Sequence, residues 1–392
     1  MKIAVVFDNM IYGGIERVGI SHIKLLKELG HEVTSYILTP KTESIVEELR
    51  ELCDVKIMNL PRKYCPEAYW VLTRRYRGGK YLFPVVYIIL SVFIGIHKLF
   101  FRDKRKYDVA IAFSGHYNDL TFVANNYVRA NYKAAWLHGA LYQYILTAQG
   151  FENLYKRINN LVVLVEDAQE EVLAYHKKDN FNFTITKIYN PVSYKGVKLD
   201  GKKMQFLKEK YGDYFVMVSR LLYPHKDHYT VIKAMKILKE KYGIKRRLVL
   251  VGDGPERDKL YEFVTKEGVE DLVVFEGNQK DVYNYYASAS ILLHASVAGE
   301  GLPTVLLEAM NLGCPVVCTD SKVGPREILG NNQYGLLCNV QDPEDMAKCI
   351  YSLIKNNDLY NHYKKCGQER TRIFSPDEIK KSLSIFLNNI ER

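Results

Sequence analysis

The sequence lacks the residue patterns of disulfide-stabilised and metal-dependent proteins. Its seven cysteines form no CxxC pair, no histidines stand at zinc-ligand spacing, and no Asp-x-Asp motif occurs. We therefore expect reduced, mostly buried cysteines of the kind found in cytosolic proteins, and no disulfide framework. A diphosphate site built from a metal ion and paired aspartates is not expected either, so we expect no essential metal.

The sequence also shows no cleavable signal, solenoid repeat or low-complexity tract. Met1–Asp8 runs into the strand-like segment IAVVF after a single lysine. One uncharged apolar run, YLFPVVYIILSVFIGI (81–96), has sixteen residues. This is fewer than the roughly 20 residues that span a bilayer.

Acidic residues are scarce around this run. Between Leu60 and Tyr107, eleven Lys and Arg residues are accompanied by only Glu67 and Asp103, so most of the net charge of +10 lies here. An apolar helix with basic ends can lie on an anionic leaflet, gaining about 1 kcal/mol per Lys or Arg near the surface. The alternative is a buried helix of the first domain with a solvated basic flank. No interleaved aromatic–basic motif indicates nucleic acid, so we expect an anionic membrane surface as partner and a peripheral location on the inner face of the cell membrane.

A length of 392 residues, 47% of them hydrophobic, favours a globular chain of two domains. Strand-like and helical segments alternate, starting with IAVVF and a helix from about Glu16 to Leu29. The expected strands are 3–7, 32–38, 108–113, 134–139 and 161–165 before a linker-like stretch (189–198), and 215–220, 247–252, 272–277, 290–296, 315–319 and 335–339 after it. This alternation predicts two Rossmann-type α/β domains with parallel sheets, and ligands at the carboxyl ends of the strands and in the cleft between the halves. A last helical pattern, Pro376–Ile390, has no strand after it.

The run GEGLPTVLLEAM (299–310) places Glu300 in a loop before a helix and Glu308 inside that helix. Proline suits a first helical position, and glycine lets the backbone approach a ligand. The helix start can therefore hold a diphosphate, while Glu308 accepts hydrogen bonds from a sugar's hydroxyls and Glu300 binds a second sugar at the mouth. Taken alone, the spacing fits two solvated glutamates equally well. The residues of the helix start expected to bind the donor are Gly301, Leu302, Pro303 and Thr304.

This run resembles the donor-site signature of the group 1 (family four) retaining glycosyltransferases, and the resemblance extends across nearly the whole chain. It implies a GT-B-like fold, in which two Rossmann-type domains face a central cleft and a C-terminal helix crosses back to the first domain. The implied domains are 1–190 for the acceptor, including the basic, apolar segment 60–107, then 191–373 for the nucleotide-sugar, and 374–392 for the crossover helix. Enzymes with similar motifs build bacterial surface polysaccharides or lipid-linked oligosaccharides.

Arg220 and Lys226, in VSRLLYPHKDH, follow the first strand of the second half. Cations at this end of a strand can stabilise the charge that develops on a departing diphosphate. In the resembled family, the matching Arg and Lys bind the donor diphosphate. The alternative is a surface pair between Lys226 and Asp227.

Two further turns match the family. Gly13 and Gly14 lie between the first strand and its helix, where the backbone can reach a phosphate, and the similar family turn approaches the donor from across the cleft. GDGPER (252–257) is interpreted as a structural strand-to-helix turn beside the nucleotide. Asn278 is a predicted base contact, because backbone groups at this place hold the base in relatives.

His138, in AAWLHG, is expected to donate to the donor sugar ring or to a backbone carbonyl near the reacting carbon. The family often has a histidine there, although a lone histidine is more often structural. His116 and Asp119 are candidates for lining the acceptor cleft. Retention without a carboxylate nucleophile would imply front-face attack with the leaving phosphate as base, a step that comes from the resemblance alone.

Together with these residues, the resemblance implies a retaining, metal-independent hexosyltransferase with His138, Glu300, Arg220 and Lys226 as catalytic residues. The expected donor is a UDP-sugar, with no essential cofactor, and the expected acceptor is a membrane-associated or lipid-linked saccharide. Three alternatives remain: a GDP-mannose-dependent lipid mannosyltransferase, a nucleotide-sugar epimerase, and a non-catalytic membrane assembly factor.

Overall fold

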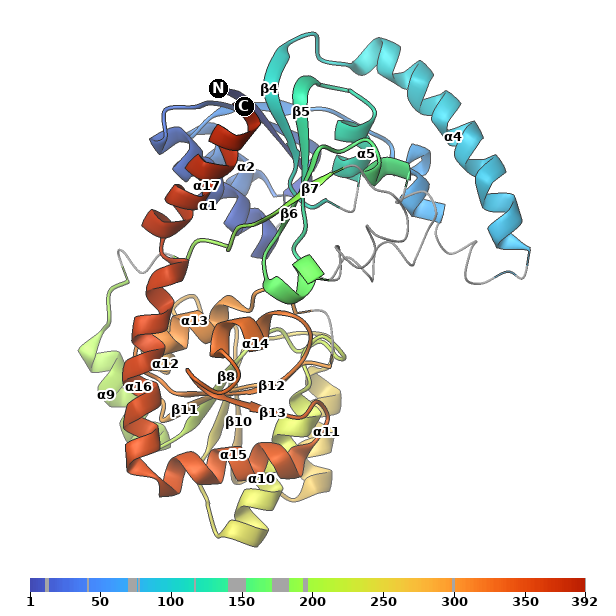
Figure 1. The fold of residues 1–392 in the computed structure, drawn as a ribbon. Coiled ribbons are helices and arrows are strands. Elements are labelled where there is room, and N and C mark those ends of the chain that lie inside the picture. The colour runs from blue at the N-terminus through green and yellow to red at the C-terminus, as the bar shows by residue number, and fades with distance from the viewer. Residues whose placement is uncertain are drawn as a thin grey trace. The chain divides into compact units, whose positions relative to one another are not determined.

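The computed structural model describes residues 1–10, 14–40, 42–69, 76, 78–115, 118–139, 153–170, 183–192, 197–297 and 300–391. The chain divides into two compact units, of which unit 1 comprises Met1–Pro191 with Pro376–Arg392 and unit 2 comprises Val192–Ser375. Each unit contains a parallel sheet with helices packed on it (Figure 1). The prediction of two Rossmann-type α/β domains is confirmed.

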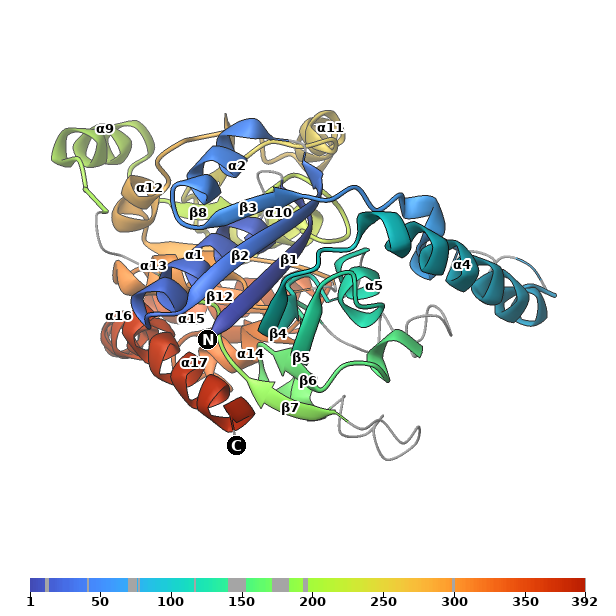
Figure 2. The same ribbon diagram turned by 90° about the horizontal axis from the view of Figure 1, so that it is seen from above.

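Unit 1 is built on a seven-stranded parallel sheet with the strand order β3-β2-β1-β4-β5-β6-β7. The strands are β1 (Lys2–Met10), β2 (Glu32–Pro40), β3 (Asp54–Ile57), β4 (Lys106–Ala112), β5 (Arg129–Trp136), β6 (Asn160–Val163) and β7 (Thr184–Lys187). The helices are α1 (Gly14–Glu28), α2 (Glu43–Arg50), α4 (Gly79–Phe101), α5 (Asn118–Ala124) and α17 (Pro376–Glu391), with 3-10 turns η1 (Arg62–Tyr64) and η2 (Pro66–Tyr69). Figure 2 shows α1 and α17 on one side of this sheet and α5 on the other, with α4 at the periphery of the unit. The C-terminal helix therefore packs in unit 1, where Lys380 forms an ion pair with Glu28 of α1.

Unit 2 is built on a six-stranded parallel sheet with the order β10-β9-β8-β11-β12-β13. The strands are β8 (Phe215–Val218), β9 (Leu248–Val251), β10 (Val273–Gly277), β11 (Ile291–His294), β12 (Val316–Thr319) and β13 (Leu336–Cys338). The helices are α9 (Gly201–Tyr211), α10 (His228–Tyr242), α11 (Arg257–Glu267), α12 (Tyr283–Ser288), α13 (Thr304–Asn311), α14 (Gly324–Leu329), α15 (Pro343–Lys355) and α16 (Asn357–Thr371), followed by the 3-10 turn η3 (Arg372–Phe374).

Local sequence signals explain several of these elements. β9 reads Leu-Val-Leu-Val and is wholly buried, as expected for a parallel strand covered on both faces. Asp227 caps α10 by accepting a hydrogen bond from the Thr230 N–H at 3.1 Å, and Asp342 caps α15 in the same way. All seven cysteines are free thiols, as the absence of paired spacings predicts.

Four elements differ from the sequence-based expectation. Strands β3 and β7 were not predicted, because each is a short, partly exposed edge strand that includes lysine. Helix α13 begins at Thr304 and Pro303 is its N-cap, one residue later than expected. Helix α4 extends beyond the uncharged run on both sides and includes Lys80 and Lys98. Its segment Tyr81–Phe101 is long and apolar enough to cross a membrane and is mostly exposed, so the alternative of a buried helix is wrong.

Candidate functional site

The candidate site of unit 2 lies at the carboxyl ends of β8 and β11, which are neighbours in the sheet. The strand order runs from β8 through β9 to β10 in one direction and from β11 through β12 to β13 in the other. Loops that leave such a switch point separate and open a crevice for ligands. The segment that contains Arg220 and Lys226 follows β8, and Glu300 follows β11.

Lys226 and Glu300 form an ion pair at this edge of the sheet. Glu300 is only 8% exposed, and its Oε1 accepts hydrogen bonds from Lys226 Nζ, Ser296 Oγ and, at 3.3 Å, His294 Nε2. Burial raises the pKa of Glu300, but the His294 hydrogen bond and the Lys226 charge outweigh it and hold the pKa well below its usual range. Burial and the Lys226 charge lower the pKa of His294. The site therefore holds an ionised glutamate beside a lysine, and the His294 Nε2 lies within hydrogen-bond distance of both.

The alternative of a Lys226–Asp227 surface pair is wrong. Asp227 is buried, its carboxylate accepts from the Thr230 N–H and hydroxyl, and its own N–H donates to the Ala295 carbonyl at 2.8 Å. These contacts fasten the end of the β8 loop to the residue after β11. Lys226 is thereby directed to Glu300.

Arg220 is exposed just after β8, and no ion pair of its side chain occurs within the described ranges. Its backbone is held by the GDGPER turn, because the Leu221 N–H donates to the Asp253 carbonyl at 3.1 Å. A Cβ on Gly254 would lie 2.3 Å from the Leu221 carbonyl oxygen, so this close approach requires glycine. The contacts agree with the interpretation of the turn as structural, and they fix the segment that carries Arg220.

The second carboxylate, Glu308, lies on α13 and is partly buried. Its Oε2 accepts a hydrogen bond from the Tyr286 hydroxyl of α12 at 3.2 Å. Burial raises the pKa of Glu308, opposed by the hydrogen bonds from Tyr286 and Thr304. The loop before α13 is fixed through the Val323 N–H, which donates to the Glu300 carbonyl at 2.9 Å. Glu300 and Glu308 therefore stand at either end of a short, well-held segment.

The remaining predicted donor contacts are spread over both units. Gly301, Leu302, Pro303 and Thr304 lie in the loop and first turn of α13, and Asn278 is exposed after β10. In unit 1, Gly14 is the first residue of α1, whereas Gly13 and His116 lie outside the described residues.

His138 follows β5 in unit 1, and its Nε2 lies 2.7 Å from the Phe113 carbonyl oxygen. Asp119 is fully buried, and its Oδ2 accepts from the N–H groups of Ser114 (2.6 Å) and Gly115 (2.9 Å). Asp119 thus holds the loop that faces His138. The place of His138 near a donor sugar and the lining of an acceptor cleft by Asp119 both stay predictions.

Sequence reasoning missed three side chains that hold the two glutamates, namely His294, Ser296 and Tyr286. His294 and Ser296 end the strand-like segment SILLHAS at the carboxyl edge, a signal that points to the site. Tyr286 comes from α12, and nothing in the sequence connects it with Glu308. Across the described part of the chain, no group of three or more His, Cys, Asp or Glu residues is placed to hold a metal ion.

Comparison with known proteins connects this geometry to a family. The family model for glycosyl transferases group 1 matches residues 201–370. The N-acetylgalactosamine-N,N'-diacetylbacillosaminyl-diphospho-undecaprenol 4-alpha-N-acetylgalactosaminyltransferase of Campylobacter jejuni is 26% identical over 234 residues, which cover 58% of this chain and 62% of that enzyme. The lipopolysaccharide core biosynthesis glycosyltransferase LpsE of Rhizobium meliloti is 33% identical over 144 residues, 37% of this chain and 40% of that protein. Both alignments thus span less than two thirds of the relative's length.

The crystal structure of Anabaena HepE in complex with UDP matches over 99% of this chain and 100% of its own, with a TM-score of 0.76 and 19% identity. This likeness extends to both units and establishes the GT-B fold. The matched segment 201–370 contains the whole Arg220, Lys226, Glu300 and Glu308 set. The match to the group 1 glycosyltransferase family model therefore lies within unit 2, and the likeness of the whole chain to HepE is one of fold.

Proposed function

We propose that this protein transfers a sugar, with retention at the anomeric carbon, from a UDP-sugar to a saccharide carried by a membrane lipid in surface polysaccharide biosynthesis. The observation that carries the proposal is the Lys226–Glu300 pair at the switch point of unit 2, with Glu308 on the adjoining helix α13. UDP as the nucleotide is supported by the ligand of the HepE structure, and a lipid-linked acceptor by the name of the Campylobacter relative.

Lys226 and the start of α13 are proposed to bind the donor diphosphate. An ammonium group has three N–H donors, so Lys226 can keep its bond to Glu300 and still donate to phosphate oxygens. Exposed Arg220 adds a second cation, and the first-turn N–H groups of Thr304 and its neighbours add further donors. Together they would stabilise the charge of the leaving diphosphate without a metal.

The two glutamates are proposed to bind sugar rather than to attack it. Glu300 Oε1 lies within hydrogen-bond distance of three side-chain groups, and we propose that these contacts hold the carboxylate in place to bind sugar. We therefore propose that the acceptor hydroxyl attacks the anomeric carbon on the face from which the diphosphate leaves. The carbon–phosphate-oxygen bond breaks, the carbon–acceptor-oxygen bond forms, and the acceptor proton passes to the leaving phosphate. Glu308 would orient the sugar through its hydroxyls, and His138, Gly14 and Asn278 remain proposed donor contacts.

An acceptor borne by a lipid requires a protein that works at a membrane. Helix α4 supports this part of the proposal, because it is apolar, mostly exposed and flanked by basic residues. We propose that the protein is peripheral on the inner face of the cell membrane.

The test is a mass-spectrometric transfer assay with a panel of UDP-sugars and GDP-mannose, each offered with polyprenyl-diphosphate-linked saccharides and with free saccharides. The proposal expects one UDP-sugar to add one residue to a lipid-linked acceptor with retained configuration. Lys226→Met should abolish transfer, and Lys266→Met, on the exposed surface of α11, should not. Conversion of the donor without an acceptor, transfer from GDP-mannose alone, or no transfer from any donor would contradict it.

A further inference from the structure

Helix α4 of unit 1 presents an unusual amount of apolar surface. Eleven large apolar side chains between Tyr81 and Phe101 are exposed, up to 78% at Phe100. Only a narrow stripe faces the unit, formed by Phe83, Leu90 and Ile94, whose spacing of seven and four residues defines one face of a helix. The helix contains no acidic residue. A soluble protein rarely leaves an apolar surface of this size in water without a partner.

Three side chains outside the buried stripe fasten the second half of α4 to unit 1. Phe93 stacks on Tyr64 of η1 with ring centroids 5.7 Å apart, and His97 Nδ1 lies 3.1 Å from the Tyr127 hydroxyl. Lys98 Nζ donates to the Asn125 carbonyl at 3.1 Å. These contacts bind the second half of α4 to the unit by its side, not by one end.

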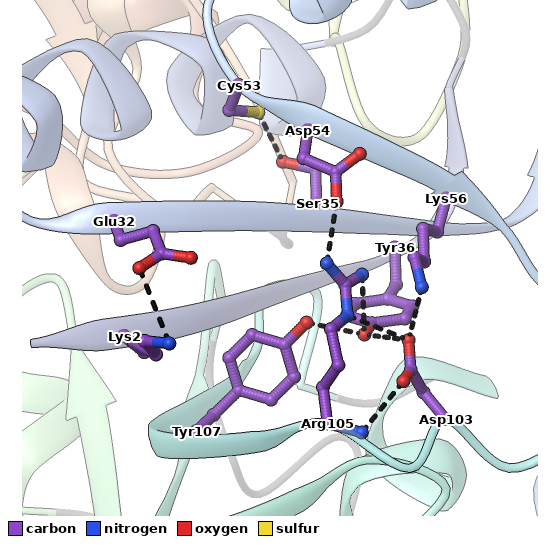
Figure 3. Close-up of polar contacts among 10 residues, drawn as sticks. All are labelled: Lys2, Glu32, Ser35, Tyr36, Cys53, Asp54, Lys56, Asp103, Arg105 and Tyr107. Atoms are coloured by element: carbon purple, nitrogen blue, oxygen red, sulfur yellow. Dashed lines mark hydrogen bonds and ion pairs between the residues drawn. The ribbon is translucent and has the colours of Figure 1, made fainter.

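The chain that leaves α4 is held by a polar clasp around Asp103, which Figure 3 shows at the amino-terminal edge of the sheet. Asp103 accepts hydrogen bonds from the Tyr36 hydroxyl at 2.7 Å and Lys56 Nζ at 2.8 Å, and from the N–H (2.9 Å) and Nε (3.2 Å) of Arg105. Burial raises the pKa of Asp103, but these partners outweigh it and keep the pKa well below its usual range. The clasp ties the end of α4 to β2, β3 and β4.

We propose that α4 is an in-plane membrane-binding helix, whose exposed face lies in the headgroup–acyl boundary of a bilayer that contains anionic phospholipid. Its 23 residues give a length of about 35 Å, enough to cross a bilayer, so length alone does not decide between the two orientations. The side-on contacts decide it, because crossing would detach Phe93, His97 and Lys98 from unit 1. A helix held along its side binds the surface and does not span.

Charge identifies anionic lipid as the partner. Arg62 and Lys63 are exposed on η1 beside the helix, and Arg102 and Lys104 are exposed where it ends. Phosphate headgroups complement these cations, whereas a second copy of the chain would bring like charges together. The cations lie next to the apolar face. A lipid surface can therefore bury the apolar side chains and attract the cations at the same time.

The first test is flotation of the full chain with vesicles of phosphatidylcholine, with or without phosphatidylglycerol, in the absence of sugar substrates. We expect strong binding only with phosphatidylglycerol, weakened by salt. Ile88→Asp and Phe100→Asp should each reduce partitioning about tenfold or more, since each loses an apolar anchor. The matched control is Phe206→Asp, an exposed phenylalanine of α9 in unit 2, which should leave it unchanged.

The second test measures depth. Tryptophans placed one at a time at Leu82, Val92 and Phe100, in a chain whose two native tryptophans (Trp70 and Trp136) are replaced by phenylalanine, should be quenched alike by shallow brominated lipids if α4 lies in the plane. A steep gradient of depth from Leu82 to Phe100 would overturn the in-plane orientation. If the protein does not float with the vesicles, the assignment of lipid as the partner is wrong. It is also wrong if sedimentation shows that the chain forms a dimer through α4 and does not bind vesicles.

This inference concerns the partner of unit 1 and does not depend on the proposed transfer reaction. UDP binding measured by calorimetry on the Ile88→Asp variant separates the two. Unchanged UDP binding with lost flotation supports both proposals, and flotation without UDP binding contradicts only the proposed function.

Discussion

Replacing Lys226 by methionine is the perturbation that best separates structure from ligand binding in unit 2. Lys226 is the cationic partner of Glu300, whose side chain is 10% exposed. Its removal leaves a buried carboxylate with Ser296 and a neutral His294, and breaking a buried pair in this way costs about 3 kcal/mol of unfolding free energy. The same variant loses a charged hydrogen bond to the diphosphate, worth about 1.5–3 kcal/mol, so UDP should bind roughly 10- to 100-fold more weakly.

Adding Glu300→Gln to Lys226→Met distinguishes the two effects. Glutamine is neutral and still accepts hydrogen bonds from Ser296 and His294, so we expect most of the lost stability to return. UDP affinity should stay low, because the cation that meets the phosphate is still missing. Urea unfolding measures the first quantity and isothermal titration calorimetry the second, with Lys266→Met as the control for the loss of one surface charge.

The double variant also provides the refutation. If it binds UDP as tightly as the native protein, Lys226 serves only to neutralise Glu300, and its assignment to the diphosphate is wrong. If Lys226→Met alone leaves stability unchanged, the buried ion pair has no energetic importance and the reasoning about Glu300 fails.

Three other predictions follow from the described contacts. Gly254→Ala should weaken UDP binding and lower the unfolding free energy by about 1–3 kcal/mol, because the alanine Cβ would lie 2.3 Å from the Leu221 carbonyl oxygen. Calorimetry measures the UDP affinity and urea unfolding the stability, and unchanged values of both would contradict this prediction. Glu308→Gln should leave UDP affinity within about twofold but remove any extra affinity for the UDP-sugar, which competition binding measures, since Glu308 is assigned to the sugar and not to the diphosphate. Burial, helped by the nearby His138, lowers the pKa of His22 to about 3, below its value in the unfolded chain. The unfolded chain therefore takes up the proton first, and the unfolding free energy should fall as the pH drops from about 6.5 toward 3. In urea unfolding, His22→Leu should reduce the slope of the unfolding free energy against pH by up to about 1.4 kcal/mol per pH unit. An unchanged slope would show that His22 is not buried as a neutral ring.

Much of the fold could be predicted from the sequence because its central strands are mostly apolar. β9 and β11 in unit 2 are buried on both faces, and such strands stand out between helical segments. The edge strands β3 and β7 contain lysine and are partly exposed, so their patterns resemble loops. The polar ends of the apolar strands also located the carboxyl edge, where Arg220 and Lys226 were expected.

The pairing of side chains within the site could not be predicted in the same way. Lys226 and Glu300 are 74 residues apart in the chain, and their contact depends on β8 and β11 being neighbours in the sheet. The sequence assigned the lysine to a phosphate and the glutamate to a sugar, and only the fold shows that they bind each other. The Tyr286–Glu308 hydrogen bond likewise depends on how α12 packs beside α13.

Helix α4 shows a different limit. Its composition indicated a helix with basic ends, but exposure is a property of tertiary packing and cannot be read from the apolar run itself. The sequence therefore left a buried helix and a membrane-facing helix open, and the exposed side chains between Tyr81 and Phe101 decide against burial.

The central claim is that side chains and N–H groups at the carboxyl edge of the unit 2 sheet bind a nucleotide diphosphate. Hydrogen–deuterium exchange of the full chain with and without UDP tests it directly. The account predicts slower exchange in the segment from Arg220 to Lys226 and in the first turn of α13 from Thr304. UDP binding that slows exchange elsewhere and leaves both segments unchanged would contradict it.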